Sequence, residues 1–453
     1  MNAAGHGAES SAGVFHEPEL AAILATLARY PRVALAVSGG ADSVALMLLV
    51  RNWLDLISGG PQITILTVDH RLREAAASEA EWVKREAQAL GFPHETLVWE
   101  GEKPNSGLQA EARHARYGLM TAYCRAASIP AIATAHSCDD QAETFVMRLA
   151  RGSGLDGLSG MEDISRRDGI DILRPLLLIS RQRIEAFLTK QEQAWLDDPS
   201  NEDERYERVR VRRKLKAAES LDLSSAAIAL SARRLRRARD ALDGMTSEFL
   251  RAKVSLHEAG FAKLRLPELF EIHEEVALRA LARMIAAVGG SSEPLRLWQI
   301  EGCYRTMRRA PRSVTLGGCR LIEKDAELTI IREIGRMDAA GACDIQSGES
   351  LLWDGRFRVT PHMGGEAGAT LRALGADGIA SVKAAKGQFR GVPRLAAMTL
   401  PSLWIEGKLC YAPFIDFAGK TPDGWSTLSH AEFTDAWHMP AAADSCENAV
   451  RPH

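Results

Sequence analysis

Between residues 33 and 149, four short apolar runs alternate with four helix-length segments. The short runs suit buried strands, and the longer segments suit helices. We expect strands at 33–37, 63–68, 94–99 and 131–135 and helices at 44–53, 78–90, 108–127 and 140–149. Because strands and helices alternate, the sequence predicts an α/β fold with a doubly wound parallel sheet. Ligands of such sheets bind outside the carboxyl ends of the strands, where the polar segments after the strands should meet.

The turn after the first predicted strand is rich in glycine and serine. It comprises Ser38, Gly39, Gly40, Ala41, Asp42 and Ser43. A strand-to-helix turn points free backbone N–H groups and the positive end of the helix dipole at one spot, which binds anions and phosphate above all. Glycine lets the backbone approach the anion closely, and the Asp42 carboxylate offers an oxygen ligand for Mg²⁺. The turn lacks the lysine of a Walker A loop, so it is not a loop of that kind. The alternative is a plain strand–helix turn capped by serine, which the six positions together disfavour.

Acidic residues follow the fourth predicted strand. His136 precedes Asp139, Asp140 and Glu143. Asp139 and Glu143 are four residues apart and therefore share a face of the predicted helix. Two carboxylates there could hold Mg²⁺ or a cationic amine. The alternative is that Asp139 or Asp140 caps the helix, with Glu143 in its first turn, and the local sequence leaves both interpretations open.

Arginines recur in two further segments. Arg113 and Arg116 are three residues apart on the helix predicted at 108–127 and could both face an anion. A solvated Glu–Arg face is the commoner fate of such charges on a helix. Arg208, Arg210 and Arg212 alternate along the chain, which predicts that they line one face of an extended segment.

Composition divides the 453-residue chain into segments. We expect disorder at 1–14, the α/β domain at 15–215, a helical domain at 216–332, a small α+β domain at 335–430 and a loose tail at 440–453. The whole chain carries a formal net charge of −3, whereas twelve Lys or Arg and three acidic residues between 205 and 239 give that stretch +9. A nucleic-acid site would therefore be a local patch.

The cysteines and the N-terminus indicate a cytoplasmic protein. Seven scattered cysteines without a Cys-x-x-Cys pair argue against a zinc ribbon or an iron–sulfur cluster and fit a reducing compartment. The N-terminal stretch has neither the basic start nor the apolar core of a signal peptide. Because no apolar run reaches membrane-spanning length, we expect no membrane partner.

The turn at 38–43 resembles the pyrophosphate loop of the PP-loop ATPases. An ordered set of motifs over residues 30–215 is similar to one branch of that superfamily, the tRNA(Ile)-lysidine synthetases. The motifs are VDHRLR at 68–73, EARHARY at 111–117, DDQAET at 139–144, RGSGLDGLSGM at 151–161, RPLL at 174–177 and WLDDPSN at 195–201. The chain departs from the family at Ser137 and Cys138, where paired histidines are usual before the two aspartates, and at Val209, where asparagine is usual.

The resemblance implies that ATP and Mg²⁺ are used to adenylate the wobble cytidine of the isoleucine tRNA with a CAU anticodon. Free lysine then displaces AMP and gives lysidine. The residues that would bind the nucleotide are those of the turn at 38–43 together with Asp69, His70 and Arg73. Asp42 and Asp139 would bind the metal. The candidate catalytic residues are Asp42, Arg113, His136, Asp139, Asp140 and Glu143, and the choice of base between His136 and the carboxylates stays open.

Basic residues are expected to contact the tRNA backbone, and binding should weaken as salt rises. They are Arg116, Arg208, Arg210, Arg212, Arg233, Arg237, Arg305, Arg308 and Arg309. The alternative is that these arginines pair with acidic residues elsewhere in the chain. Whether the chain acts alone or as a homodimer is left open.

Three other functions compete with this hypothesis. A tRNA thiolase is disfavoured by the scattered thiols. An amidotransferase-type synthetase is disfavoured because no motif supplies a glutaminase nucleophile. A non-catalytic ATP-binding or tRNA-binding module is disfavoured because an acidic cluster accompanies an intact phosphate-binding turn.

Overall fold

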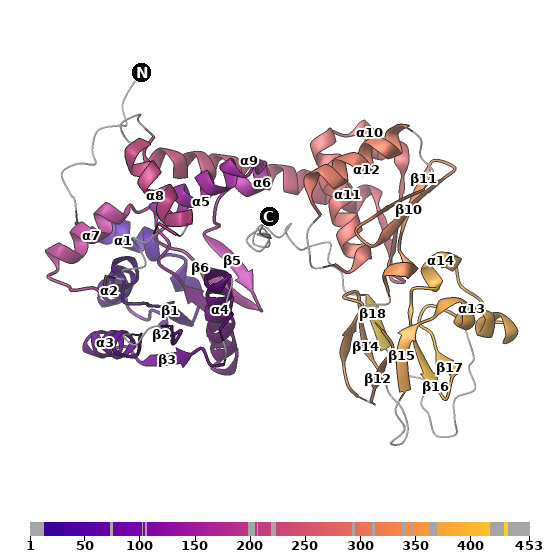
Figure 1. Ribbon diagram of the computed structural model, residues 1–453, viewed down its shortest axis with the longest axis horizontal. Coiled ribbons are helices and arrows are strands. Elements are labelled where there is room, and N and C mark those ends of the chain that lie inside the picture. Colours follow the sequence, from indigo (N-terminus) through magenta and orange to yellow (C-terminus); the bar gives the residue numbers. More distant parts are fainter. Residues whose placement is uncertain are drawn as a thin grey trace. The chain divides into compact units, whose positions relative to one another are not determined.

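The computed structural model describes residues 13–72, 76–101, 103–104, 107–197, 204–205, 207–218, 223–291, 295–309, 313–337, 341–346, 348–361, 369–416 and 430–433. The chain divides into two compact units (Figure 1). The first unit comprises Met1–Arg239 with Val450–His453, and the second comprises Asp240–Ala449. Helix α9 (Ser225–Lys253) contributes residues to both units.

A six-stranded sheet, in the order β3-β2-β1-β4-β6-β5, forms the centre of the first unit. Neighbouring strands pair in parallel except for β5, which pairs with β6 in the antiparallel direction. The strands are β1 (Arg32–Ala36), β2 (Gln62–Asp69), β3 (His94–Val98), β4 (Ala131–Ala133), β5 (Ile164–Arg167) and β6 (Ile170–Leu173). The predicted parallel sheet is confirmed, and the structure adds β5 and β6 to the four expected strands.

Helices cover both faces of this sheet because successive residues of a strand point to opposite sides. Val33 and Leu35 of β1 pack against α1, α2, α3 and α7, whereas Ala34 packs on the other face with α4. The helices are α1 (Glu17–Leu24), α2 (Ala41–Leu56), α3 (Ala76–Ala89), α4 (Leu108–Ala126), α5 (Cys138–Ala150), α6 (Leu155–Leu158), α7 (Arg181–Lys190) and α8 (Glu207–Ala218). The sheet is therefore doubly wound, as predicted.

Strand β1 lies between β2 and β4, so the order of the strands reverses at β1. The chain leaves β1 toward β2 and leaves β4 toward β6, so the two connections run toward opposite edges of the sheet. In α/β sheets the crevice that binds ligands lies at such a point, outside the carboxyl ends of the strands. The turn at 38–43 follows β1, and His136 follows β4. The topology thus brings two of the predicted site segments to the same place.

The second unit begins with a five-stranded antiparallel sheet in the order β7-β8-β11-β10-β9. Helices α10, α11 and α12 and the end of α9 share its core. The elements are β7 (Ser255–His257), β8 (Phe261–Arg265), α10 (Leu266–Glu271), α11 (Glu274–Gly289), α12 (Leu297–Arg309), β9 (Ser313–Leu316), β10 (Cys319–Lys324) and β11 (Glu327–Arg332). The helical prediction for 216–332 missed this sheet. Its clearest signal was Gly317-Gly318, a two-residue hairpin connection in which both φ angles are positive.

Two smaller antiparallel sheets follow, in the orders β12-β15-β16-β17 and β13-β14-β18. The elements are β12 (Cys343–Ile345), β13 (Leu351–Trp353), β14 (Phe357–Thr360), β15 (Ala369–Ala373), α13 (Gly375–Ala384), α14 (Arg394–Ala397), β16 (Pro401–Ile405), β17 (Lys408–Tyr411) and β18 (His430–Phe433). This mixture agrees with the predicted α+β character of the C-terminal region. The predicted tail at 440–453 lies outside the described residues.

A buried ion network joins the two parts of the second unit. Asp354, after β13, accepts two hydrogen bonds from Arg332 of β11, at 2.8 and 3.0 Å, and one from Arg356 Nε at 2.7 Å. Arg332 also donates to the Gly318 carbonyl oxygen, and Arg356 donates to that of Thr399. Burial lowers the pKa of Arg356 to about 10 although Asp354 opposes the shift. One carboxylate therefore compensates two guanidinium groups that are largely removed from water.

We predict that Asp354→Ala destabilises the second unit by about 3–5 kcal/mol, because it removes a buried carboxylate that compensates two buried cations. The matched control is Asp377→Ala, since Asp377 pairs with Arg372 at the surface with 57% of its side chain exposed, against 4% for Asp354. The control should cost about 0–1 kcal/mol. Urea unfolding followed by tryptophan fluorescence measures both changes, and equal costs would contradict the role assigned to the network.

Candidate functional site

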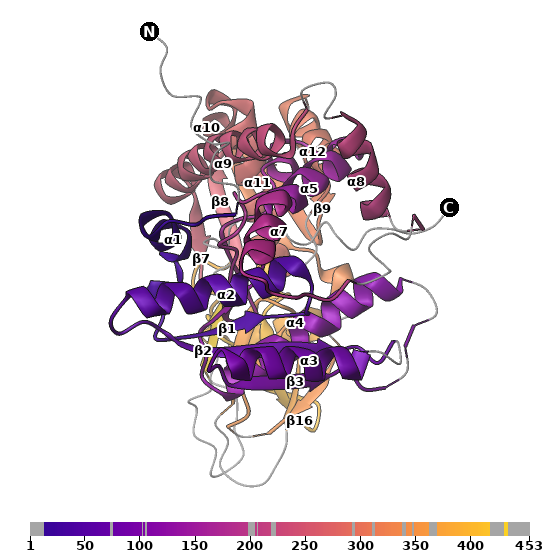
Figure 2. The same cartoon turned by 90° about the vertical axis from the view of Figure 1, so that its left-hand side faces the viewer.

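Hydrogen bonds bring the N-termini of α2, α5 and α7 together in the first unit. Figure 2 shows the three helices. Helix α2 begins after β1, α5 begins after β4, and α7 begins at Arg181. The Cys138 N–H at the start of α5 donates to the Ile179 carbonyl oxygen just before α7, at 2.9 Å. The Arg181 N–H donates to Asp139 Oδ2 at 2.7 Å, and Arg181 Nη2 donates to Asp42 Oδ2 at 3.1 Å. Three positive helix ends at one place favour anions there.

The turn at 38–43 has the strand–turn–helix geometry predicted for it. Ser43 Oγ donates to the Gly40 carbonyl oxygen at 2.8 Å and accepts from the Ser38 N–H at 3.2 Å. Gly39 has φ +93°, which favours glycine, and its carbonyl oxygen accepts from the Leu196 N–H at 2.9 Å. A Cβ on Gly39 would lie 2.7 Å from Leu196 Cδ1, whereas a Cβ on Gly40 would meet, among the residues that the structure describes, only Ser38 Oγ, at 3.9 Å. The Gly40 side of the turn is therefore open, and Leu196 packs on the other side.

Asp42, in the first turn of α2, is the most strongly perturbed carboxyl of the site. Burial raises its pKa to about 6, Arg181 opposes this shift, and Asp140 and Asp139 reinforce it. Its Oδ2 accepts from Arg181. Its Oδ1 is buried and has no hydrogen-bond partner among the residues that the structure describes. This oxygen is a suitable ligand atom for a hard cation.

The structure supports the capping interpretation of the acidic helix. Asp140 Oδ2 accepts from the Ser137 N–H at 2.9 Å and from Ser137 Oγ at 3.1 Å, so Asp140 completes a capping box at the start of α5. Burial alone would raise the pKa of Asp140, but Arg208, His136 and Arg181 hold it below its usual value. Asp139 uses both oxygens, one for the Arg181 N–H and one for Ser225 Oγ at 3.0 Å. Asp42 is therefore better placed than Asp139 to bind a metal.

Glu143 is shared by two arginines. Only 1% of its side chain is exposed, its Oε1 lies 2.6 Å from Arg212 Nε, and its Oε2 lies 3.1 Å from Arg208 Nε. The extended segment predicted for these arginines is wrong, because they lie on α8. Arg208 and Arg212 are four residues apart, so on a helix they share a face, and Arg210 points elsewhere to the carbonyl oxygens of residues 204 and 205. Arg208 and Arg212 are thus part of the buried site.

The predicted catalytic residue His136 has several basic neighbours. His136 Nδ1 lies 2.9 Å from Thr134 Oγ1. Burial, assisted by Arg174, Arg113 and Arg208, holds the pKa of His136 well below its usual value despite the nearby Asp140. His136 is therefore a neutral ring at pH 7. Burial and the neighbouring Arg113 and Arg208 also lower the pKa of Arg116.

The segment after β2 contains His70, which also has basic neighbours. Burial, together with Arg116 and Lys103, lowers the pKa of His70, and Asp69 opposes the shift. His70 also lies edge-on to Trp99, with ring centroids 5.8 Å apart. Asp69 Oδ1 accepts from the Arg71 N–H at 2.8 Å. The predicted site residue Arg73 lies outside the described residues.

Sequence reasoning missed Arg181 and gave Arg174 no role. Arg174 is buried, and its Nη1 donates to the Glu162 carbonyl oxygen at 2.8 Å and to Ser165 Oγ at 3.0 Å. Arg181 follows the N-cap residue Ser180. A cation is unfavourable in the first turn of a helix, where acidic residues are preferred. An arginine directly after a serine N-cap therefore indicates that this side chain pairs with a residue outside its own helix.

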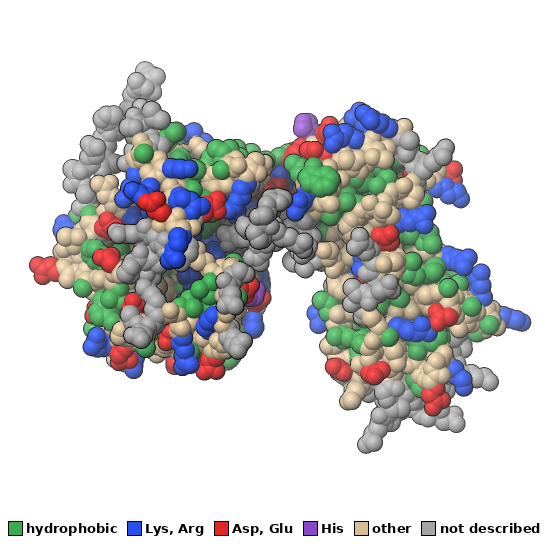
Figure 3. Space-filling view, viewed as in Figure 1, with side chains coloured by type: hydrophobic (Ala, Val, Ile, Leu, Met, Phe, Trp, Pro, Cys, Tyr) green, Lys and Arg blue, Asp and Glu red, His purple; other side chains and the backbone are tan. Residues whose placement is uncertain are grey.

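The predicted nucleic-acid arginines on α9 and α12 are exposed. Arg233 and Arg237 lie on the solvent side of α9, whereas Arg236 and Arg239 pair with Asp163 and Glu162, at 3.3 and 2.8 Å. The exposed arginines of α12 are Arg305, Arg308 and Arg309. Figure 3 shows Lys and Arg side chains interspersed with acidic ones on the first unit. The basic stretch at 205–239 therefore contains arginines that form ion pairs within the first unit and arginines that face solvent.

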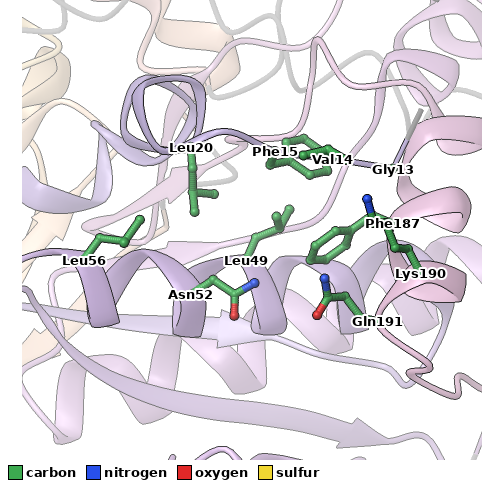
Figure 4. A pocket seen from close by; sticks show the side chains of 10 residues that line it. All are labelled: Gly13, Val14, Phe15, Leu20, Leu49, Asn52, Leu56, Phe187, Lys190 and Gln191. Carbon is green, nitrogen blue, oxygen red and sulfur yellow. The ribbon is translucent and has the colours of Figure 1, made fainter. Parts of the chain in front are cut away.

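A pocket of about 200 Å³ in the first unit lies away from this site (Figure 4). Phe15, Leu20 and Leu49 are among its lining residues, so it lies between α1, α7 and the later turns of α2. Arg183 of α7 pairs with Glu19 through two contacts of 2.6 and 2.7 Å and donates to the carbonyl oxygen of Val14, one of the lining residues. Residues 13 and 14, predicted as disordered, are therefore held against α7.

Two features of the described residues bear on the predicted partners. No group of three or more His, Cys, Asp or Glu there could hold a metal ion. A magnesium site would thus use one or two carboxylates and the phosphates of the nucleotide, as is usual for Mg²⁺. In the same residues, no helix is both long and apolar enough to span a membrane.

We predict that the two glycines of the turn differ in their response to alanine. Gly39→Ala forces a side chain into a left-handed backbone and against Leu196, which should cost about 1–2 kcal/mol of stability. Gly40→Ala should change stability by no more than about 0.5 kcal/mol. If the open side of Gly40 receives phosphate, Gly40→Ala should still weaken ATP binding about tenfold or more. Thermal unfolding and calorimetry check this, and unchanged ATP affinity in Gly40→Ala would contradict it.

Comparisons with known proteins identify the family. The PP-loop domain family matches residues 16–219. The tRNA(Ile)-lysidine synthase of Ruegeria pomeroyi is 37% identical over 398 residues, which cover 87% of this chain and 90% of that protein. The tRNA(Ile)-lysidine synthase of Wolbachia pipientis wMel is 32% identical over 86% of the chain and 90% of that protein. That of Bradyrhizobium diazoefficiens is 40% identical over 71% and 92%. The chain therefore belongs to the tRNA(Ile)-lysidine synthase family.

Proposed function

We propose that the protein is a ligase that uses ATP to join lysine to carbon 2 of the wobble cytidine in the isoleucine tRNA with a CAU anticodon. The products are lysidine, AMP and pyrophosphate. One observation carries the proposal: the phosphate-binding turn and the acidic start of α5 are joined by the hydrogen bonds of a single residue, Arg181. A site for ATP and a site for a cationic amine are therefore adjacent.

The first step is adenylation of the cytosine oxygen. The turn and the N-terminus of α2 hold the ATP phosphates through backbone N–H groups that are already oriented toward the leaving pyrophosphate. Asp42 would hold Mg²⁺ through Oδ1, the buried oxygen without a partner in the described part of the chain. Mg²⁺ bound with ATP supplies positive charge against the negative charge that grows on pyrophosphate.

The second step needs lysine as a neutral amine beside the activated carbon. Glu143 is already neutralised by Arg208 and Arg212, so Asp140, which stays ionised, is the stronger candidate to bind the ammonium group. The neutral ring of His136 is available to accept a proton from it. Arg113 and Arg116 would contact phosphate.

The target cytosine lies in an anticodon loop, whose bases can be reached without opening a duplex. Arg233 and Arg237 on α9 and Arg305, Arg308 and Arg309 on α12 would track the tRNA backbone. The substrates place the reaction in the cytoplasm, where tRNA and free lysine are both present.

The test is incorporation of radiolabelled lysine. The whole protein is incubated with ATP, Mg²⁺, lysine and either the isoleucine tRNA transcript or the methionine tRNA that shares its CAU anticodon. We expect stable label on the isoleucine tRNA alone, with one AMP formed for each lysine bound. Asp42→Asn should lower the rate by at least about a hundredfold, because the metal ligand is lost. No labelling of either tRNA would refute the ligase; unchanged activity in Asp42→Asn would refute the role of Asp42.

The raised pKa of Asp42 predicts proton release when the nucleotide binds. With a pKa of about 6, roughly half of the Asp42 carboxyls are protonated at pH 6. Because a cation binds the ionised form, binding of ATP with Mg²⁺ at pH 6 should release about half a proton from Asp42, and affinity should fall as the pH drops further. Calorimetry in buffers of different ionisation enthalpy counts the protons. Asp42→Asn should lack this release, and equal release from both proteins would contradict the prediction.

A further inference from the structure

Arg181 contacts three aspartates from two segments of the site. Its Nη2 and Nε approach Asp42 Oδ2 at 3.1 and 3.4 Å. Its backbone N–H donates to Asp139 Oδ2 at 2.7 Å, and its Nη2 lies 3.9 Å from Asp140 Oδ1. The side chain is 24% exposed. One residue of α7 thus links the phosphate-binding turn to the first turn of α5.

The two oxygens of Asp42 have different surroundings. Both guanidinium contacts go to Oδ2, so Oδ1 is the oxygen left without a partner in the described part of the chain. A carboxylate with one oxygen fixed cannot rotate freely about its last bond. The direction of Oδ1 is therefore set by Arg181.

The position of Arg181 works against helix stability. It occupies the first residue of α7, where the helix dipole disfavours a cation. Burial would lower its pKa, but Asp42 and Asp140 raise it above the usual value, so the side chain stays charged. Arg183, two residues on, forms its ion pair with Glu19 instead and reaches none of the three aspartates through the contacts described above.

We propose that Arg181 is a positioning residue for the metal and nucleotide. It fixes Asp42 so that Oδ1 faces the place where the cation of ATP·Mg²⁺ binds. It also holds the turn at 38–43 next to the first turn of α5. This inference rests on the proposed use of ATP and Mg²⁺ by the same site. Arg181 acts through Asp42, so its loss should affect binding that depends on magnesium more than binding of ATP alone.

The test compares Arg181→Met, Arg181→Lys and Arg183→Met in the full chain. Arg183→Met is the matched control, because Arg183 lies on the same helix, is 26% exposed and also pairs with a carboxylate. Calorimetry measures the affinity for ATP with Mg²⁺ and with EDTA, and thermal unfolding measures stability.

We expect Arg181→Met to weaken ATP·Mg²⁺ binding roughly ten- to a hundredfold, the range for loss of a hydrogen bond to a charged group. ATP affinity in EDTA should change by less than about threefold. Arg181→Lys can still donate to Asp42 Oδ2 and should recover most of the loss, and Arg183→Met should bind as the wild type does even where its stability falls.

Two results would overturn the inference. Equal loss of binding in Arg181→Met and Arg183→Met would mean that both act only through the stability of α7. Equal loss with and without Mg²⁺ would mean that Arg181 acts on the phosphates rather than through Asp42. If the wild-type protein transfers no lysine while the magnesium-dependent effect is present, the ligase proposal fails and the role of Arg181 stands.

Discussion

The positive ends of three helices point at one place in the first unit, and the chemistry of the site depends on how this charge is balanced. Asp42, Asp139 and Asp140 lie in the first turns of α2 and α5 and supply negative charge. Arg181 at the start of α7 compensates part of it. Burial raises the pKa of Asp42 to about 6, and Arg181 opposes that shift only in part. The function that we propose uses both features, with phosphate at the helix ends and a cation at Asp42.

The topology of the sheet is what brings these helices together. β1 lies between β2 and β4, so the segments after β1 and β4 flank a single crevice. Contacts of long sequence separation then complete the site. Leu196 packs on the turn that holds Gly39, and Glu143 receives Arg208 and Arg212 from α8. The acidic and basic residues of the site thus come from segments spread over nearly 180 residues.

The parts of the site that depend on local sequence could be predicted, and the parts that depend on distant contacts could not. Residues 38–43 carry their geometry in their own glycines and serines, so the turn was found. Arg181 contacts Asp42, which is 139 positions away in the sequence, and a local sequence pattern cannot identify so distant a partner. The arginines at 208, 210 and 212 lie on a helix. Their spacing of two residues also matches the period of a strand, so the sequence predicted an extended segment. In the second unit, strands of three to six residues were too short to compete with the helical periodicity around them.

Cys138, the first residue of α5, lies among these charged groups as a free thiol. A helix N-terminus normally stabilises a thiolate, yet burial raises the pKa of Cys138 to about 11 with a further contribution from Asp139. Almost no thiolate is therefore present at neutral pH. The protein can carry a cysteine beside its phosphate-binding turn without offering a nucleophile to oxidants or alkylating reagents, so the redox state of its surroundings should leave this part of the site unmodified.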